Sequence, residues 1–242
     1  MDQPSIEIVP RYCGPPNSGN GGYVAGRLAE FVDAPAVAVR LRVPPPLDTP
    51  LAVRAAADGV LLFDGETPVA EARGVALDLR APTAPPSFEE ATKAALGFRG
   101  FEEHVFPGCF VCGTEREEGD GLRIFPGPSS SDGTFAAPWI PDPSLARDGD
   151  RVPTEFLWAA LDCPGAFSFA QPEGRIILLG EMQAQIFGPV TVGERCVLTS
   201  WEIEVRGRRH FTGSALFGNS GECRGLALGV WIEVEAGAAP KG

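Results

Sequence analysis

The segment that most constrains the fold is residues 152–167, VPTEFLWAALDCPGAF, a largely apolar stretch with one acid, Asp162, inside it. Proline and glutamate near its start suit a helix N-terminus, where a missing N–H costs nothing and a negative charge faces the positive end of the dipole. Apolar side chains cover most of the circumference, so we expect a helix enclosed by protein, ended by Pro164 and Gly165. An ionised carboxylate in such surroundings needs a partner.

The acidic composition of the chain limits the kinds of molecule that it can bind. A formal charge of −12 and a pI near 4.7 argue against non-specific binding to nucleic acid or to an anionic membrane. No apolar stretch approaches the roughly 20 residues of a membrane span, and the N-terminus does not resemble a signal peptide. We therefore expect a cytoplasmic protein with a small-molecule ligand. Its six cysteines should then be reduced thiols, mostly in packing roles.

The first part of the chain predicts one helix among strands. A glycine-rich loop over residues 13–22 (CGPPNSGNGG) cannot be regular structure, and Asp64 and Gly65 form a hairpin-turn signal. The predicted elements are a strand over 6–12, a helix over 23–32, and strands over 36–43, 51–57 and 69–79.

The second part repeats that order. Residues 81–86 (APTAPP) have linker composition, and Ser87 with Glu90 forms a capping-box pattern for a short helix to Leu96. A loop-rich region leads to the long helix, with a Pro-Gly-Ser tract over 126–133. The predicted strands cover 134–140, 176–187, 194–205, 210–217 and 226–234, with a short apolar run at 122–125.

Three landmarks recur in the same order in both parts: an acid ending the apolar run of a helix (Glu30 and Asp162), a proline turn and a Gly-Glu turn. Their separation grows along the chain, as loop insertions in a duplicated unit would cause. We expect two copies of one α+β unit. The predicted boundaries are a first unit at 1–80, a linker with a short helix at 81–104, a second unit at 105–236 and a tail at 237–242.

These features together resemble the hotdog fold of acyl-CoA thioesterases and related dehydratases. CFVCG at residues 109–113, GLR at 121–123 and WAALDCPG at 158–165 are similar to uncharacterised actinobacterial members. The resemblance covers nearly the whole chain, one hotdog unit in each half. It implies a sheet wrapped around the long helix of each half, the two sheets joined edge to edge, and acyl-thioester sites between the halves.

The family's catalytic motif is incomplete in both halves. In the thioesterase branch that the chain most resembles, a His-Gly-Gly loop precedes the helix and a catalytic Asp follows. Here residues 20–22 are Asn-Gly-Gly, the position of the Asp is Ala29, and Glu30 comes one residue later. One residue rotates a helical side chain by about 100°, so Glu30 should face elsewhere.

In the second half, Asp162 stands near the expected place, but Pro153 and Thr154 occupy the glycine positions. This leaves one composite site, in which the loop Asn20 to Gly22 of the first half faces Asp162 of the second.

Such a site could hydrolyse a thioester. The N–H groups of Gly22 and Tyr23 at the helix start could form an oxyanion hole, with Asp162 as base or nucleophile and Asn20 orienting thioester or water. Neighbouring candidates for substrate binding are Gly21, Tyr23, Thr154 and Trp158. The alternatives are a structural acid near a helix end and a tight glycine turn that lets the backbone cross closely.

Cys109 and Cys112 are a lone pair of potential ligands. A four-ligand zinc site needs two more, and near in sequence there is only His104. We predict no metal and assign both thiols to a buried loop. Two histidines and no Gly-x-Ser-x-Gly elbow give a Ser-His-Asp triad poor support.

Arg206, Arg208 and Arg209 form the main basic cluster and could hold the phosphates of coenzyme A. The alternative is a solvated hairpin turn.

The expected function is hydrolysis of an acyl-CoA or related acyl thioester in a cleft between the halves, with coenzyme A present as part of the substrate and no other cofactor. The alternative from another class is a non-catalytic acyl-CoA or small-ligand binding protein of the same fold. A third possibility is an assembly surface, which would make the protein a homo-oligomer.

Overall fold

A single antiparallel sheet organises the molecule, which a computed structural model describes over residues 3–129, 133–147 and 149–238. The 11-stranded sheet has the order β1-β3-β4-β5-β2-β8-β11-β10-β9-β7-β6. The strands are β1 (Ser5–Ile6), β2 (Ala36–Leu41), β3 (Leu51–Ala56), β4 (Gly59–Asp64), β5 (Thr67–Gly74), β6 (Gly127–Pro128), β7 (Phe135–Trp139), β8 (Arg175–Ile186), β9 (Cys196–Arg206), β10 (Arg209–Phe217) and β11 (Cys223–Glu235).

The two halves of the chain share this sheet through β2 and β8, which pair antiparallel with Val37 opposite Ala184 and Val39 opposite Met182. These four side chains are buried, so the junction lies within the core. The predicted α+β class and the edge-to-edge joining of two sheets are confirmed.

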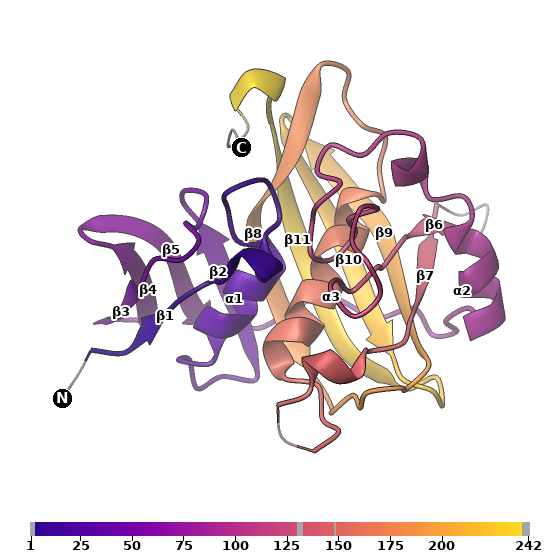
Figure 1. Cartoon of the computed structure of the whole chain (residues 1–242), viewed down its shortest axis with the longest axis horizontal. Helices are drawn as coiled ribbons and strands as arrows, with labels where there is room; N and C mark the ends of the chain where they lie inside the picture. Colours follow the sequence, from indigo (N-terminus) through magenta and orange to yellow (C-terminus); the bar gives the residue numbers. More distant parts are fainter. Residues whose placement is uncertain (1–2, 130–132, 148, 239–242) are drawn as a thin grey trace.

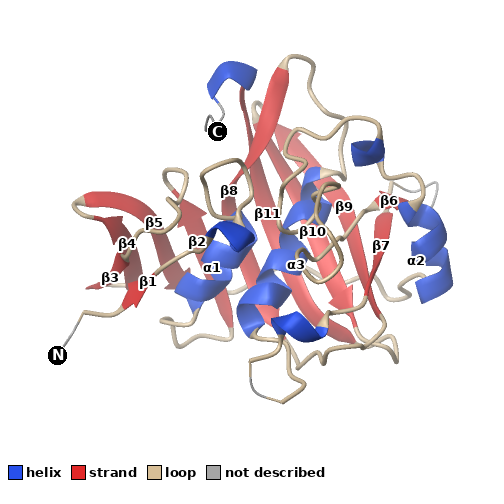
Figure 2. Ribbon diagram, in the orientation of Figure 1, coloured by secondary structure: helices blue, strands red, loops and turns tan. Residues whose placement is uncertain are grey.

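Over the described residues, three α-helices accompany the sheet: α1 (Gly21–Ala29), α2 (Phe88–Ala95) and α3 (Thr154–Ala166). Helices α1 and α3 lie side by side against one face, while α2 lies near β7 at the edge (Figures 1 and 2). Short 3-10 helices occur at Pro10–Tyr12, Arg99–Phe101, Pro143–Leu145 and Ala236–Ala238.

Helix α3 is enclosed, as its sequence predicted: every residue from Glu155 to Gly165 is buried. The predicted end of the helix at Pro164 and Gly165 was wrong, because α3 continues through both residues to Ala166. The Pro164 carbonyl accepts hydrogen bonds from Ser168 Oγ at 3.0 Å and Ser200 Oγ at 2.9 Å. These tertiary contacts hold the last turn in place despite the N–H that proline lacks.

The chain before α1 also differs from its prediction. The strand expected over 6–12 stops at Ile6, and Pro10–Tyr12 forms a 3-10 helix. The prediction missed that Pro10 has no N–H for a ladder, so the chain turns instead. The Ser87 capping box at the start of α2 is present as predicted.

Several predictions stay untested. The boundaries at 80/81, 104/105 and 236/237 remain predictions, and residues 239–242 of the tail, like 130–132 of the Pro-Gly-Ser tract, lie outside the described residues. None of the helices in the described ranges has the length and apolar character that a membrane span requires.

Candidate functional site

The N-terminus of α1 is fixed by its own loop. Asn20 is the N-cap, and its Oδ1 accepts the Tyr23 N–H at 2.9 Å. The Asn20 N–H donates to the Tyr12 carbonyl at 2.8 Å, and the Gly19 N–H donates to the Pro45 carbonyl at 2.8 Å. The loop is therefore tied both to the 3-10 helix and to the proline turn after β2, which leaves the Asn20 amide group pointing at α3.

Asp162 of α3 receives that amide group. Its Oδ2 accepts hydrogen bonds from Asn20 Nδ2 at 3.0 Å and from the Gly22 N–H at 2.9 Å. Its Oδ1 is buried and has no hydrogen-bond partner among the described residues. The loop of the first half and the acid of the second half thus meet, as the composite site predicted.

This meeting requires a glycine at position 22. A Cβ atom there would lie 2.4 Å from Asp162 Cβ and 2.8 Å from the Trp158 carbonyl oxygen. Real Cβ atoms do not approach backbone so closely, and therefore α1 could not reach Asp162 with any larger residue. The alternative interpretation of the loop as a close backbone crossing is correct, and the same crossing creates the site.

The environment shifts the ionisation of Asp162. Burial raises the pKa of Asp162 to about 7, and the neighbouring Cys109 adds to this, while the hydrogen bonds from Gly22 and Asn20 oppose it. The side chain is 4% exposed. The carboxyl group therefore binds a proton far more readily than an ordinary aspartate does.

Three thiols adjoin the same amide group. Cys109 Sγ and Cys163 Sγ lie 3.7 Å apart, and Asn20 Nδ2 lies 4.0 Å and 3.8 Å from them. Cys112 completes the group, and the three sulfur atoms lie within 4.8 Å of one another. The sequence could not show this third thiol, because Cys163 comes from α3 rather than from the loop that carries the other two.

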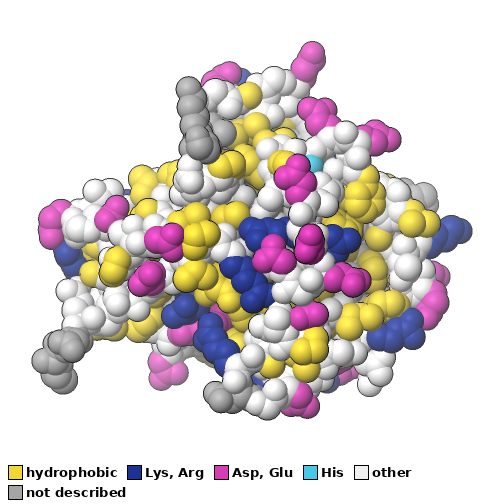
Figure 3. All heavy atoms as spheres, in the orientation of Figure 1, with side chains coloured by type: hydrophobic (Ala, Val, Ile, Leu, Met, Phe, Trp, Pro, Cys, Tyr) yellow, Lys and Arg dark blue, Asp and Glu magenta, His cyan; other side chains and the backbone are white. Residues whose placement is uncertain are grey.

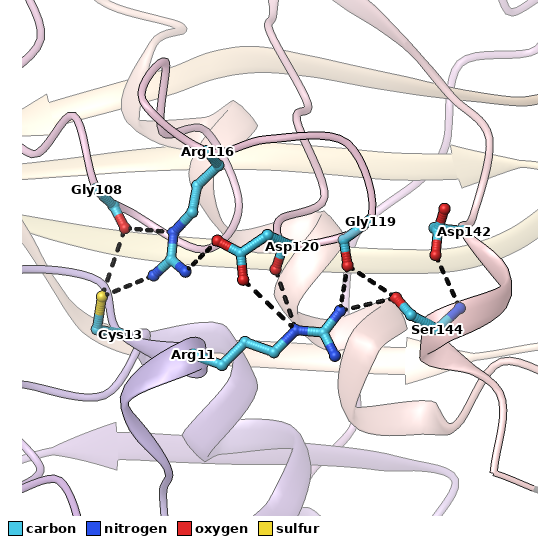
Figure 4. Close-up of polar contacts among 8 residues, drawn as sticks. All are labelled: Arg11, Cys13, Gly108, Arg116, Gly119, Asp120, Asp142 and Ser144. Carbon is cyan, nitrogen blue, oxygen red and sulfur yellow. Dashed lines mark hydrogen bonds and ion pairs between the residues drawn. The ribbon is translucent and has the colours of Figure 1, made fainter.

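Arginines hold the loop that carries Cys109 (Figure 4). Arg116 Nε donates to the Gly108 carbonyl at 2.8 Å, and Arg116 Nη2 contacts Cys13 Sγ at 3.1 Å. Arg11 donates to the Gly119 carbonyl at 2.6 Å, also shown in Figure 4. In the space-filling view of Figure 3, basic side chains gather near the middle of the face turned to the viewer, and acidic side chains lie around them.

A cavity of about 1020 Å³ lies beside these groups. Asn20, Asp162 and the three thiols form a polar part of its wall. Apolar side chains, including Phe106, Phe167, Ile177, Leu179 and Trp231, form much of the rest. A β-bulge between Val230 and Trp231 marks the part of β11 that reaches the cavity. The combination of an apolar wall and a few convergent polar groups is typical of a small-molecule site.

The predicted oxyanion hole is wrong. The Gly22 N–H donates to Asp162, and the Tyr23 N–H donates to its own N-cap, so neither is available to a substrate. Gly21 lies on the cavity wall, and its N–H has no hydrogen-bond partner among the described residues. One helix N–H rather than two could therefore serve a ligand here.

Three other predicted substrate contacts do not reach the cavity wall. Tyr23 stacks on Tyr12, with ring centroids 4.3 Å apart, and Trp158 is buried where α3 crosses α1. Thr154 begins α3, at the end remote from Asp162. Glu30 is also off the wall, as its register predicted, and lies 3.6 Å from Arg27 Nε.

The basic cluster Arg206, Arg208 and Arg209 lies at the β9–β10 turn and does not line the cavity either. Arg206 pairs with Glu204 at 2.7 Å. The solvated-turn alternative fits better. Arg99 and Arg175, which the sequence did not single out, do line the cavity; no local motif marks them, because each comes from a separate segment.

Solved structures with a similar fold were found over most of the chain. The chain matches the TesB protein of Mycobacterium avium subsp. paratuberculosis at a TM-score of 0.57 and 14% identity, over 95% of this chain and 92% of that one. It matches a candidate thioesterase II of Thermobifida fusca at a TM-score of 0.56 and 12% identity, over 96% of this chain and 92% of that one. It matches the acyl-CoA thioesterase II TesB2 of Mycobacterium marinum at a TM-score of 0.53 and 11% identity, over 83% of this chain and 80% of that one.

These similarities extend over most of each chain, and they confirm the predicted double-hotdog fold. At such identities they carry the fold and not the chemistry. No protein-family model matches the sequence, and no curated protein matches it.

Proposed function

We propose that the protein hydrolyses an acyl thioester, with an acyl-CoA as the leading substrate class. One observation carries the proposal: Asp162 lines a cavity and is held through Oδ2 by the Gly22 N–H and the Asn20 amide, while its buried Oδ1 has no hydrogen-bond partner among the described residues. A buried carboxylate oxygen beside a cavity is positioned to act on a water or a carbonyl group. The structures with the same fold include an acyl-CoA thioesterase II.

In the proposed reaction, Asp162 Oδ1 takes a proton from water as the water oxygen adds to the thioester carbonyl. The carbon–sulfur bond then breaks, and the coenzyme A sulfur takes the proton from Asp162 and leaves as the thiol. Asn20 is the positioning residue, because its amide fixes Oδ2 and thereby the direction of Oδ1. The Gly21 N–H is the candidate donor to the carbonyl oxygen.

The cavity wall also suggests where each part of the substrate lies. Leu179, Ile177 and Trp231 suit an acyl chain. Arg175 lies on the same wall with 36% of its side chain exposed and pairs with Glu233 at 3.0 Å, while the Arg99 guanidinium donates to the Phe169 and Ala166 carbonyls. A phosphate of coenzyme A would therefore share the more exposed Arg175 with Glu233.

A panel of acyl-CoA thioesters of increasing chain length tests the proposal. Loss of the far-ultraviolet thioester absorbance should be seen with wild type and should depend on chain length. Asp162→Asn keeps the size of the side chain and should lower turnover by about 10²- to 10⁴-fold while leaving ligand binding. Turnover that is unchanged in Asp162→Asn would overturn the assignment of Asp162.

One observation favours a second candidate, a non-catalytic acyl-CoA binding protein. Both N–H groups expected to polarise the carbonyl are already occupied within the protein. If no member of the panel is hydrolysed while one of them raises the melting temperature of wild type, binding is the function and hydrolysis is not.

A further inference from the structure

The thiols of Cys109, Cys112 and Cys163 have no part in the proposed hydrolysis, although they form a compact group. Their sulfur atoms lie within 4.8 Å of one another, and all three residues are buried and line the cavity. In the described part of the chain, no second cluster of three such ligand atoms occurs.

We infer that these three thiols bind one Zn²⁺ ion whose fourth coordination position faces the cavity. In tetrahedral zinc sites the Zn–S distance is about 2.3 Å, which places two sulfur ligands about 3.8 Å apart. Cys109 Sγ and Cys163 Sγ are 3.7 Å apart. This edge of the sulfur triangle therefore has the length that the ion requires, and the two edges to Cys112 Sγ are no longer than 4.8 Å.

The turn that joins two of the ligands is shaped for this role. The Gly113 N–H donates to the Cys109 carbonyl at 2.9 Å. A Cβ at Gly113 would lie 2.3 Å from the Cys109 carbonyl oxygen, so the tight turn requires glycine.

Asn20 supplies a partner outside the ligand set. Its Nδ2 lies 3.8 Å from Cys163 Sγ and 4.0 Å from Cys109 Sγ. Ligands of protein metal sites are commonly oriented by such second partners. The same amide donates to Asp162, so the thiols and the acid are fixed by one side chain.

Charge and softness select the ion. Three thiolates are soft ligands, which favour zinc over magnesium or calcium. Binding replaces three S–H protons by one Zn²⁺, releases three protons, and leaves a complex of net charge −1. Three protein ligands with an open fourth position are the arrangement of catalytic rather than structural zinc sites. A water or a ligand atom in the cavity would fill that position.

The inference does not depend on hydrolysis, because it is tested without substrate. The full chain is reduced, freed of metal with a chelator, loaded with Zn²⁺, desalted, and assayed for zinc by mass spectrometry. We expect one zinc per chain, and after loading with Co²⁺ the thiolate charge-transfer and tetrahedral visible bands. Zinc affinity should fall in Cys109→Ser and Cys163→Ser by more than the roughly 10- to 100-fold that loss of an outer partner causes.

Cys196→Ser is the matched control, because Cys196 is also buried but lies on β9 outside the cluster. It should retain full zinc binding. If the cluster variants fail to fold, wild type still decides the question: zinc should protect three thiols from alkylation under native conditions. Failure of wild type to bind zinc, or retention of zinc by a folded Cys163→Ser, would overturn the inference.

The open position is tested separately with His104, which lines the same cavity. His104→Ala should still bind one zinc with tetrahedral Co²⁺ bands. If this variant loses zinc as completely as Cys163→Ser does, the fourth position is closed by histidine and that part of the inference is wrong.

Discussion

The crossing of α1 and α3 has two ends, and only one of them is built as a site. Gly22 lies against Trp158 and Asp162, while Gly26 lies against Glu155 and Trp158, so the helices run antiparallel. We call the end with Asn20, Gly22 and Asp162 the site end. The other, with Glu30 and the start of α3, is the distal end.

The distal end has the same helix geometry with different groups. Pro153 is the N-cap of α3 and makes no side-chain cap bond. Glu155 is 2% exposed and pairs with Arg147 at 2.5 Å, while the Glu30 side chain is 42% exposed beside Arg27. A helix crossing alone therefore does not create a site. The site end also has a capping side chain with a spare N–H and a glycine that admits a carboxylate.

The largest expected effect tests the two acids against each other. Asp162→Asn should lower kcat/KM for acyl-CoA hydrolysis by about 10²- to 10⁴-fold, the contribution of a positioned general base. Glu30→Gln should leave it unchanged, because Glu30 does not line the cavity. Steady-state kinetics of both variants on one thioester would measure this. Equal losses in the two variants would end the distinction between the ends.

The next effect concerns the close approach at the site end. Gly22→Ala should reduce the free energy of unfolding by about 1–3 kcal/mol, because its Cβ would overlap Asp162 and the backbone of α3. Gly108→Ala is the control, since a Cβ there meets nothing within 4 Å. Urea unfolding of the two variants would check the prediction, which fails if both variants match wild type.

A smaller effect separates capping from positioning. Asn20→Ala should lower stability by about 0.5–2 kcal/mol through loss of the N-cap of α1. Ser87→Ala removes the N-cap of α2 and should cost a similar amount. Activity should fall in Asn20→Ala alone, mainly in kcat, because Asp162 loses the amide that orients it. A parallel loss of activity in both variants would show that capping, not positioning, matters.

The smallest effect is expected at the distal end. Burial, followed by the proximity of Glu155, raises the pKa of Glu30. Because folding raises this pKa, the ionised Glu30 carboxylate destabilises the folded state. The destabilisation begins as the pH rises above the pKa of the unfolded state, and it disappears as the pH falls through the carboxyl range. Glu30→Gln should raise stability by less than about 0.5 kcal/mol at neutral pH, and not at all in acid. Melting temperatures of wild type and Glu30→Gln from acid to neutral pH would measure this difference in stability. A marked loss of stability in Glu30→Gln at neutral pH would contradict the prediction.

The sequence was most informative where local pattern and packing agree. The enclosed helix around Asp162 and the long strands β8 to β11 were predicted closely, because their apolar runs are long. Boundaries failed where tertiary contacts override local signals, as when Ser168 and Ser200 bind the Pro164 carbonyl.

The site was predictable in part for the same reason. Asn20 and Asp162 could be paired because Asn20 stands in the glycine-rich loop before α1 and Asp162 is the one acid inside the apolar helix α3. The occupied N–H groups of Gly22 and Tyr23 could not be foreseen, since they depend on distances between segments. The nearness of Cys163 to Cys109 is likewise a product of the fold.

The pairing of β2 with β8 has a consequence for how the two ends can vary. In a symmetric homodimer each substitution appears twice, so both ends of a helix crossing must change together. Here both halves belong to one chain, and a substitution at one end leaves the other untouched. The protein can therefore keep Asp162 buried and oriented while Glu30 is tuned for solubility, a freedom that a two-fold assembly of identical subunits does not have.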